Sequence, residues 1–293
     1  MILAAIDIGS NAARLLITEV VISTTEPQYN KLNLVRVPLR LGFDVFETGI
    51  IGADKLTMFT YTMQAFQLIM KAYSVVQYKA YATSAMRDAT NGNEVINHIK
   101  KVTDINIEII TGDKEAMIVY ENHIAENMDN DKSYLYIDVG GGSTECSYFN
   151  NGKLVFKKSY NIGTIRLLKN MVQLHEWETM KEEIKNATKD AKEVIAIGSG
   201  GNINKVFSLS KKKDGKPLPV ELLRDYYKEM SNQTLAQRMN NYGLREDRAD
   251  VLVPALQIYT NLMRWTNAKE IYVPKIGLAD GLIKHLYQEI ITA

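Results

Sequence analysis

Apolar runs of strand type alternate along the chain with segments whose apolar residues recur every three or four positions. The helical spacing is clearest over residues 53–73. Strands are expected at residues 14–22, 31–41, 77–82, 107–110, 134–139, 146–149, 153–162, 194–197 and 270–273. Helices are expected at 53–73, from 83–88 to about 101, at 114–127, from 163 onward, at 177–192, from 202 to about 209, over most of 220–269 and at 278–291. A glycine-marked loop is expected over 42–52 and a polar loop over 211–219. Strands grouped before helices, twice over, predict a duplicated α/β architecture.

The segment of residues 136–145 combines a strand pattern with three consecutive glycines and a second strand pattern. A strand, a tight turn and another strand make a hairpin whose backbone N–H groups can face one point. Glycine lacks a Cβ, so a bulky anion can approach the main chain closely. Asp138 and Glu145 bracket the turn, and carboxylates beside a phosphate indicate a hard cation such as Mg²⁺. The alternative interpretation is a glycine-rich hairpin with two exposed acids.

A similar pattern stands near the N-terminus, where an apolar run leads into Asp7, Gly9 and a polar turn before the strand pattern of residues 14–22. Asp7 and Asp138 lie 131 positions apart (138 − 7). The matching patterns predict an internal duplication of one phosphate-binding unit. Two facing loops would close on the same phosphate from opposite sides.

Composition narrows the class of protein. A chain of 293 residues accommodates two domains, and 46% hydrophobic with 24% charged residues is typical of soluble globular proteins. No apolar run reaches the roughly 18 residues of a membrane span, and residues 1–6 are too short for a signal-peptide core. The single cysteine, Cys146, excludes an internal disulfide and suits the cytoplasm. A net charge of +1 supplies no basic excess, so a polyanion would need local basic patches. Neither a nucleic acid nor a membrane is expected as partner.

Several common catalytic patterns are absent from the sequence. The four histidines show no paired metal spacing, and neither a G-x-S-x-G elbow nor a Walker A motif is present. These absences weigh against a serine hydrolase and a P-loop enzyme.

Short motifs occur in a fixed order along nearly the whole chain. They are Asp7-Ile8-Gly9-Ser10-Asn11 with Arg14-Leu15, Thr83-Ser84-Ala85-Met86-Arg87, Gly112-Asp113-Lys114-Glu115-Ala116, Asp138-Val139-Gly140-Gly141-Gly142-Ser143-Thr144-Glu145, and residues 248–250 with 273–282. In these motifs the chain resembles the exopolyphosphatase / guanosine pentaphosphate phosphohydrolase (Ppx/GppA) family, within the actin, Hsp70 and sugar-kinase (ASKHA) superfamily. The resemblance implies duplicated ribonuclease H-like domains with an interdomain cleft. The first would comprise residues 1–116 with a returning helix at 279–293, and the second residues 117–278.

The resemblance also assigns roles to individual residues. Glu115 aligns with the family's proposed general base, which takes a proton from the attacking water, and Arg87 aligns with its substrate arginine. Phosphate oxygens would be bound by Ser10, Asn11, Arg14, Gly140, Gly141, Gly142, Ser143 and Thr144. Asp138 and Glu145 would hold Mg²⁺, with Asp7 completing its surroundings. The implied reaction is Mg²⁺-dependent hydrolysis of the terminal phosphate of inorganic polyphosphate.

Three alternatives stay open. The first is hydrolysis of guanosine pentaphosphate, the family's other activity. The second is an ATP-dependent phosphotransferase, with Gly198, Gly200, Gly201 and Asn202 as a nucleotide-binding turn. The third is a non-catalytic phosphate-binding protein. The expected oligomeric state is a monomer or a homodimer.

Two features depart from the family pattern. Ala12 stands where the family often has a second serine, which removes one hydroxyl donor. The long members of the family carry a further helical domain for which 293 residues leave no room, so processive work on long chains is in doubt.

Overall fold

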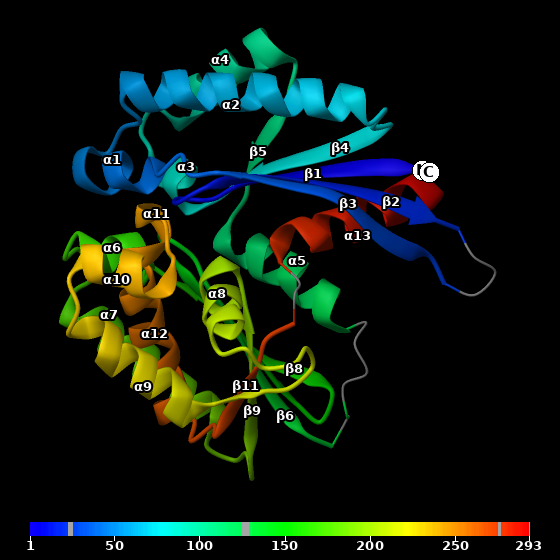
Figure 1. Ribbon diagram of the computed structural model, residues 1–293. Coiled ribbons are helices and arrows are strands. Elements are labelled where there is room, and N and C mark those ends of the chain that lie inside the picture. The colour runs from blue at the N-terminus through cyan, green and yellow to red at the C-terminus, as the bar shows by residue number, and fades with distance from the viewer. Residues whose placement is uncertain (23–25, 125–128, 130, 275–276, 293) are drawn as a thin grey trace. The chain divides into compact units, whose positions relative to one another are not determined.

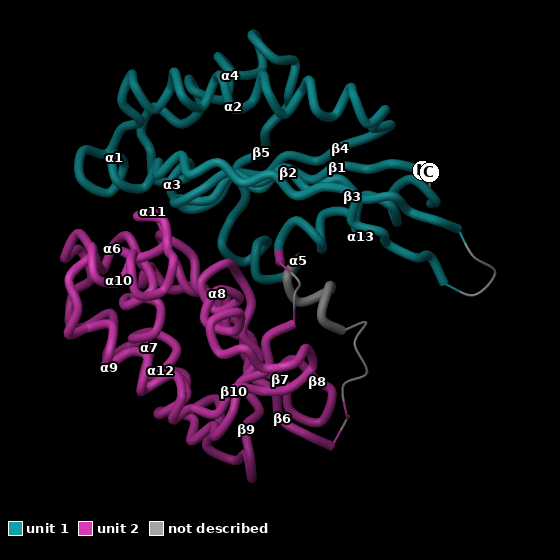
Figure 2. The backbone as a smooth tube through the Cα atoms, in the orientation of Figure 1, with its two compact units in different colours: residues 1–122, 278–293 teal, residues 123–277 magenta. Residues whose placement is uncertain are grey.

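The computed structural model describes residues 1–22, 26–124, 129, 131–274 and 277–292. The chain divides into two compact units, shown in Figure 2. Unit 1 comprises residues 1–122 and 278–293, and unit 2 comprises residues 123–277. Unit 1 is therefore built from two stretches of chain that lie far apart in the sequence.

Unit 1 contains a five-stranded sheet in the order β3-β2-β1-β4-β5. Its strands are β1 (Ile2–Ile8), β2 (Ala13–Val21), β3 (Gln28–Val37), β4 (Gln77–Ala82) and β5 (Ile107–Ile109). β1, β2 and β3 pair antiparallel, whereas β1, β4 and β5 pair parallel. Its helices are α1 (Leu41–Thr48), α2 (Ala53–Ala72), α3 (Ser84–Asp88), α4 (Gly92–Thr103), α5 (Gly112–Ile124) and α13 (Leu278–Thr292).

Both faces of this sheet are covered within unit 1, with α2 and α4 on one face and α13 on the other (Figure 1). Consequently β1 is apolar at consecutive positions rather than at alternate ones, as a doubly covered strand requires. On the α13 side, Leu282 and Leu286 join Leu3 and Leu16 in one buried cluster. A Cβ on Gly281 would lie 2.6 Å from the carbonyl oxygen of Ile118, so the glycine permits α13 to cross α5 closely.

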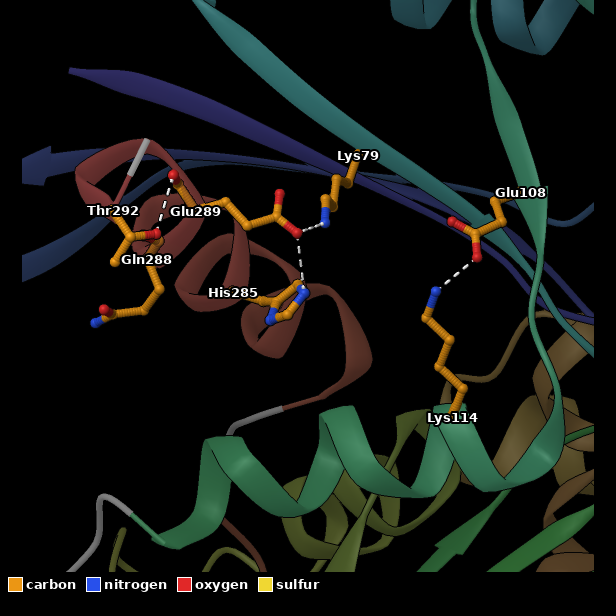
Figure 3. Close-up of polar contacts among 7 residues, drawn as sticks. All are labelled: Lys79, Glu108, Lys114, His285, Gln288, Glu289 and Thr292. Atoms are coloured by element: carbon orange, nitrogen blue, oxygen red, sulfur yellow. Dashed lines mark hydrogen bonds and ion pairs between the residues drawn. The ribbon is translucent and has the colours of Figure 1, made fainter.

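Polar contacts accompany this packing (Figure 3). Lys79 of β4 forms an ion pair with Glu289 of α13, and Nε2 of His285 lies 3.1 Å from the same carboxylate. Lys114 of α5 donates a hydrogen bond of 2.6 Å to Glu108 of β5. These pairs are exposed, so they fix the register of α13 and α5 more than they add stability.

Unit 2 contains a six-stranded sheet in the order β10-β11-β9-β6-β7-β8. Its strands are β6 (Ser133–Val139), β7 (Thr144–Asn150), β8 (Lys153–Tyr160), β9 (Val194–Ser199), β10 (Leu218–Pro219) and β11 (Glu270–Tyr272). Its helices are α6 (Thr164–Leu168), α7 (Leu174–Thr188), α8 (Gly201–Leu209), α9 (Val220–Ser231), α10 (Leu235–Tyr242), α11 (Glu246–Ala249) and α12 (Leu252–Trp265).

The two sheets repeat one topology. Taken from its other edge, the second sheet runs β8-β7-β6-β9-β11, with the same antiparallel and parallel pairings as β3-β2-β1-β4-β5. The strand β10 is an addition at the edge of unit 2. The predicted duplicated α/β class is confirmed.

Several predicted elements need correction. Residues 41–48 form α1 instead of belonging to a strand and a glycine-marked loop, because Leu41, Val45 and Phe46 present one buried helical face. The helix expected from 83–88 to about 101 is two helices, α3 and α4, with Gly92 against the carbonyl of Met86. Residues 177–192 were expected to be helical, but α7 spans Leu174–Thr188 and has a capping box at its start.

Two further predicted segments, the loop at 211–219 and the helix at 114–127, differ in extent from what the structure describes. The loop expected at 211–219 ends in the short strand β10. Positions 125–127 of the expected helix 114–127 lie outside the described residues. Within the described part of the chain, no helix combines the length and the apolar character needed to cross a bilayer.

Candidate functional site

In unit 1, three parallel strands end at the same edge of the sheet, and a predicted site residue follows each strand by two to six positions. β1 leads into Ser10, β4 leads into α3 with Arg87, and β5 leads into α5 with Glu115. The carboxyl edge of parallel strands is where ligands bind in open α/β sheets. Motifs that are far apart in the sequence therefore lie side by side along one edge of the sheet.

The loop after β1 is closed by a hydrogen bond from the amide of Gly9 to the carbonyl oxygen of Ala12, at 3.1 Å. The buried hydroxyls of Ser10 and Ser84 lie 2.8 Å apart, which joins this loop to the one after β4. The amide of Gly42, at the start of α1, donates to the carbonyl oxygen of Ser10 at 2.9 Å. The loop is thus held from two sides before any ligand binds.

Asp7 and Arg14 are cross-strand partners on β1 and β2. Nη1 of Arg14 lies 2.6 Å from Oδ2 of Asp7, whose side chain is almost fully buried. The guanidinium neutralises a carboxylate that would otherwise be costly to bury. In this structure the side chain predicted to bind phosphate and the side chain predicted to face the cation bind each other.

Arg87 and Glu115 both lie at the same edge of the sheet. Nη1 of Arg87, on α3, donates a 2.9 Å hydrogen bond to the carbonyl oxygen of Ile110, just after β5. Glu115 lies in the first turn of α5, and its amide donates to the carbonyl oxygen of Thr111 at 3.0 Å. The arginine side chain therefore reaches the chain segment that leads into the helix of Glu115. Both residues are of intermediate exposure overall, and Oε2 of Glu115 is buried.

In unit 2, the loop after β6 repeats the geometry of the loop after β1. The amide of Gly140 donates to the carbonyl oxygen of Ser143 at 2.9 Å, which is the Gly9 to Ala12 bond shifted by 131 positions. The amide of Ile165, at the start of α6, donates to the carbonyl oxygen of Gly141 at 2.8 Å, in the place of the bond from Gly42 to Ser10 in unit 1. The duplication thus extends from strand order to individual hydrogen bonds.

Thr144 and Gly163 hold this second loop against α6. The hydroxyl of Thr144 donates to the carbonyl oxygen of Ile162 at 2.5 Å, so this side chain fastens the loop. A Cβ on Gly163 would lie 2.4 Å from the carbonyl oxygen of Gly141, which leaves room only for glycine. The side chain predicted to bind phosphate has a structural partner here.

Arg166 was missed by the sequence reasoning. Its Nε donates a 2.7 Å hydrogen bond to the carbonyl oxygen of Gly142, in the middle of the glycine run. The signal was available in the spacing of Gly163 and Arg166, which places the arginine one turn into the helix that follows β8. Arg166 brings a positive charge to the loop.

Asp138 and Glu145 face each other across β6 and β7, so their side chains lie on the same face of the sheet. Glu145 is buried, and its Oε1 accepts a 2.8 Å hydrogen bond from the hydroxyl of Ser159. Two neighbouring carboxylates supply the hard oxygen ligands that Mg²⁺ prefers. Among the described residues, however, no three acidic, His or Cys side chains are grouped to hold a metal. The donor set fits an ion that completes its coordination with water and substrate phosphates.

The turn of residues 198–202 lies directly against Asp138. Gly200 has a φ of 93°, and a Cβ on it would lie 2.5 Å from Oδ1 of Asp138. Nδ2 of Asn202 donates to the carbonyl oxygen of Val139 at 3.3 Å, and the buried hydroxyl of Tyr259 donates to that of Ser199 at 2.8 Å. These contacts give the turn a role in positioning Asp138, independent of any nucleotide.

The chain thus consists of two similar α/β units, each with a hydrogen-bonded turn after its first strand. Residues 20–289 match the model of the Ppx/GppA phosphatase family. The chain belongs to this family.

Three relatives are named for different activities. The chain is 32% identical over 195 residues to a bifunctional 3-dehydroquinate synthase/phosphatase of Fusobacterium nucleatum, covering 64% of the chain and 29% of that protein. It is 21% identical over 298 residues to a putative exopolyphosphatase of Haemophilus influenzae, covering 97% and 91%. It is 23% identical over 294 residues to a guanosine-5'-triphosphate,3'-diphosphate pyrophosphatase of Pseudoalteromonas translucida, covering 96% and 57%. The chain thus spans under two thirds of the length of the first and third of these proteins.

Solved structures show the same fold. A crystal structure of an exopolyphosphatase from Cytophaga hutchinsonii has a TM-score of 0.84 at 23% identity, covering 99% of this chain and 98% of that one. The family member from Aquifex aeolicus has a TM-score of 0.75 at 22% identity, covering 99% and 98%.

Proposed function

We propose that this protein is an exopolyphosphatase that hydrolyses the terminal phosphate of inorganic polyphosphate with water. The observation that carries the proposal is the duplicated loop, in which Gly9 and Gly140 close the same turn at the carboxyl edge of their sheets. Family membership and full-length similarity to a putative exopolyphosphatase support the same reaction. Each loop would bind phosphate oxygens through backbone amides, with Ser10, Asn11 and Ser143 as side-chain donors.

Glu115 is proposed as the general base. A carboxylate in the first turn of a helix at the edge of the sheet can accept the proton of a water molecule that attacks phosphorus. Arg87 is proposed to bind the terminal phosphoryl group, because a guanidinium keeps its charge and offers paired donors to phosphate oxygens. Its present bond to a carbonyl oxygen leaves further donors for a ligand. The protein's contribution would be mainly positioning and neutralisation of charge.

Asp138 and Glu145 are proposed to hold Mg²⁺. When bound, the ion would neutralise negative charge on the phosphates. Asp7 is retained as a contributor only through its ion pair with Arg14, which fixes the charge balance beside the first loop.

The second candidate is hydrolysis of guanosine pentaphosphate. It is favoured by the similarity, over 96% of this chain, to the pyrophosphatase of Pseudoalteromonas translucida. Both candidates cleave a terminal phosphoanhydride, so they differ in how the rest of the substrate is bound.

Release of inorganic phosphate from short polyphosphate, long polyphosphate, guanosine pentaphosphate and ATP, with and without Mg²⁺, distinguishes the candidates. We expect the highest kcat/KM on polyphosphate, with Glu115→Gln as the inactive control. A higher kcat/KM on guanosine pentaphosphate would select the second candidate. Transfer to an acceptor, with ATP consumed, would indicate a phosphotransferase, and no release from any substrate would contradict both hydrolase proposals.

A further inference from the structure

The outward face of α2 carries no charge between its first and last turns. Between Lys55 and Lys71 the helix has no Asp, Glu, Lys or Arg at any position, over about four turns. Tyr61 and Leu68 are 67% and 64% exposed, and Met58 is 37% exposed. Isolated exposed apolar residues are ordinary, but a continuous apolar stripe on a long surface helix marks an interaction site.

The neighbouring helix α4 provides an internal comparison. It covers the same face of the sheet as α2, yet its exposed positions include Glu94, Asn97, His98 and Lys101. Both helices bury one apolar face in unit 1, and only α2 is also apolar on the outside. The lack of charge is therefore a property of α2 and not of the whole helical layer.

From the second turn onward, the exposed apolar residues of α2 follow the spacing of a helix–helix seam. They are Met58, Tyr61, Ala65, Leu68 and Ala72, separated by three, four, three and four positions. This is the a/d repeat of helices that pack side by side. Five exposed apolar residues at this spacing indicate contact with a whole helix and not with a single side chain.

We propose that α2 pairs with α2 of a second copy of this chain, antiparallel and about a twofold axis near Met63. This pairing sets Met58 against Leu68 of the partner subunit and Tyr61 against Ala65 of the partner subunit. At the centre of the seam, the large side chain of Tyr61 therefore packs against a small one. A twofold axis makes each contact occur twice. The seam is complementary to itself.

The ends of the helix supply matching charges. Asp54 lies on the same stripe in the first turn, and Lys71 lies beside the stripe in the last turn. In the antiparallel pairing Asp54 approaches Lys71 of the partner subunit, again twice, whereas a parallel pairing sets like charges together. A single helix pair buries less than the roughly 1,200 Å² of a stable interface, so we expect a dissociation constant in about the micromolar range.

Sedimentation equilibrium across a concentration series tests the dimer. Tyr61→Glu and Leu68→Glu, both at exposed positions that leave the fold intact, should each raise the dissociation constant by about 100-fold or more. Asn97→Glu on α4 is the matched control and should leave it within about twofold. A monomer at all concentrations, or a dimer that tolerates both substitutions, would overturn the proposal and leave this face to another partner.

The orientation is tested by charge reversal. Asp54→Lys should raise the dissociation constant by about three- to tenfold, and the double variant with Lys71→Asp should restore it. Failure of the second substitution to rescue the first would contradict the antiparallel pairing.

Oxidative cross-linking tests the register. In the proposed pairing, thiols of Met58→Cys alone lie about 15 Å apart along the axis, as do those of Leu68→Cys alone, and neither should cross-link. A mixture of the two variants should form a disulfide between subunits. Cys146 is buried and does not compete. Cross-linking in either single variant, or none in the mixture, would show that α2 pairs differently or not at all.

Discussion

Oδ1 of Asp138 lies where a side chain on residue 200 would begin, since a Cβ on Gly200 would be 2.5 Å away. Gly200→Ala must therefore move the carboxylate or the turn, and its φ of 93° adds strain. We expect a loss of about 1–3 kcal/mol in the free energy of unfolding and at least a tenfold loss of kcat/KM. Gly215→Ala is the control, because Gly215 also has a positive φ but has nothing within 4 Å of its Cβ position. Equal activity losses in the two variants would refute the positioning role.

Glu115→Gln keeps the size of the side chain but removes its ability to accept a proton at neutral pH. Phosphate release should fall by about 10²–10⁴-fold while substrate still binds, because the water loses its base. Glu108→Gln is the control and should retain activity, because Glu108 lies seven positions earlier, on β5, and is paired with Lys114. Wild-type turnover in Glu115→Gln would remove this residue from the mechanism.

Asp138→Asn and Glu145→Gln each replace a hard anionic ligand by a weaker neutral one. We expect the Mg²⁺ concentration for half-maximal activity to rise by about tenfold or more in each variant. Asp129→Asn, an exposed acid paired with Lys132 in the same unit, should leave the requirement unchanged. Full activity of the wild-type protein in excess chelator would show that the two carboxylates serve another purpose.

Arg14→Gln leaves the buried carboxylate of Asp7 without its guanidinium. We expect urea denaturation to show a loss of about 2 kcal/mol, because an uncompensated charge near the core is costly. Adding Asp7→Asn should recover part of this loss. The exposed pair of Lys132 and Asp129 offers a comparison, since Lys132→Gln should cost less than about 0.5 kcal/mol. A similarly small effect of Arg14→Gln would mean that Asp7 is solvated.

The contact between α13 and β4 should weaken in acid. The hydrogen bond from Lys79 lowers the pKa of Glu289 below its ordinary value of 4.5. The stabilisation is therefore complete above about pH 4.5 and is lost as the pH falls through the lower pKa of the folded state. Glu289→Gln should remove about 0.5 kcal/mol at pH 7, the scale of an exposed pair, and less at pH 3. Thermal unfolding at both pH values measures the difference, and an equal effect at pH 3 would exclude the ionic contribution.

The strands of both units follow from the sequence because their apolar runs are long and end at glycine or polar turns. Residues 53–73 show helical spacing over five turns, and α2 begins at Ala53 as predicted. In contrast, α1 has only eight residues and its start requires a left-handed conformation at Arg40, a choice that local sequence does not dictate. The break between α3 and α4 depends on how Gly92 meets Met86, which is a tertiary contact.

The parts of the candidate site that lie in the two glycine turns could be predicted from the sequence. The two glycine turns and their offset of 131 positions are visible in the sequence, and the structure adds the hydrogen bonds that make them equivalent. The partners of Asp7 and Thr144 were not predictable, because each is chosen by strand register and by the helix that follows. Arg166 was missed because its function, binding a loop carbonyl, leaves no motif beyond one glycine three residues earlier.

The division of unit 1 into two stretches of chain has a consequence for biosynthesis. The face of the sheet formed by Leu3, Ala5 and Leu16 is covered by α13, which is synthesised only after the whole of unit 2. Residues 123–277, 155 in all (277 − 122), separate the two stretches, which at roughly 5–20 residues per second is about 8–30 s of translation. During this interval the nascent N-terminal sheet presents an uncovered apolar face, while unit 2 can already fold. A premature stop codon before Leu278 would therefore destabilise unit 1 and leave unit 2 complete. Chaperones that hold nascent chains would bind the strands of unit 1.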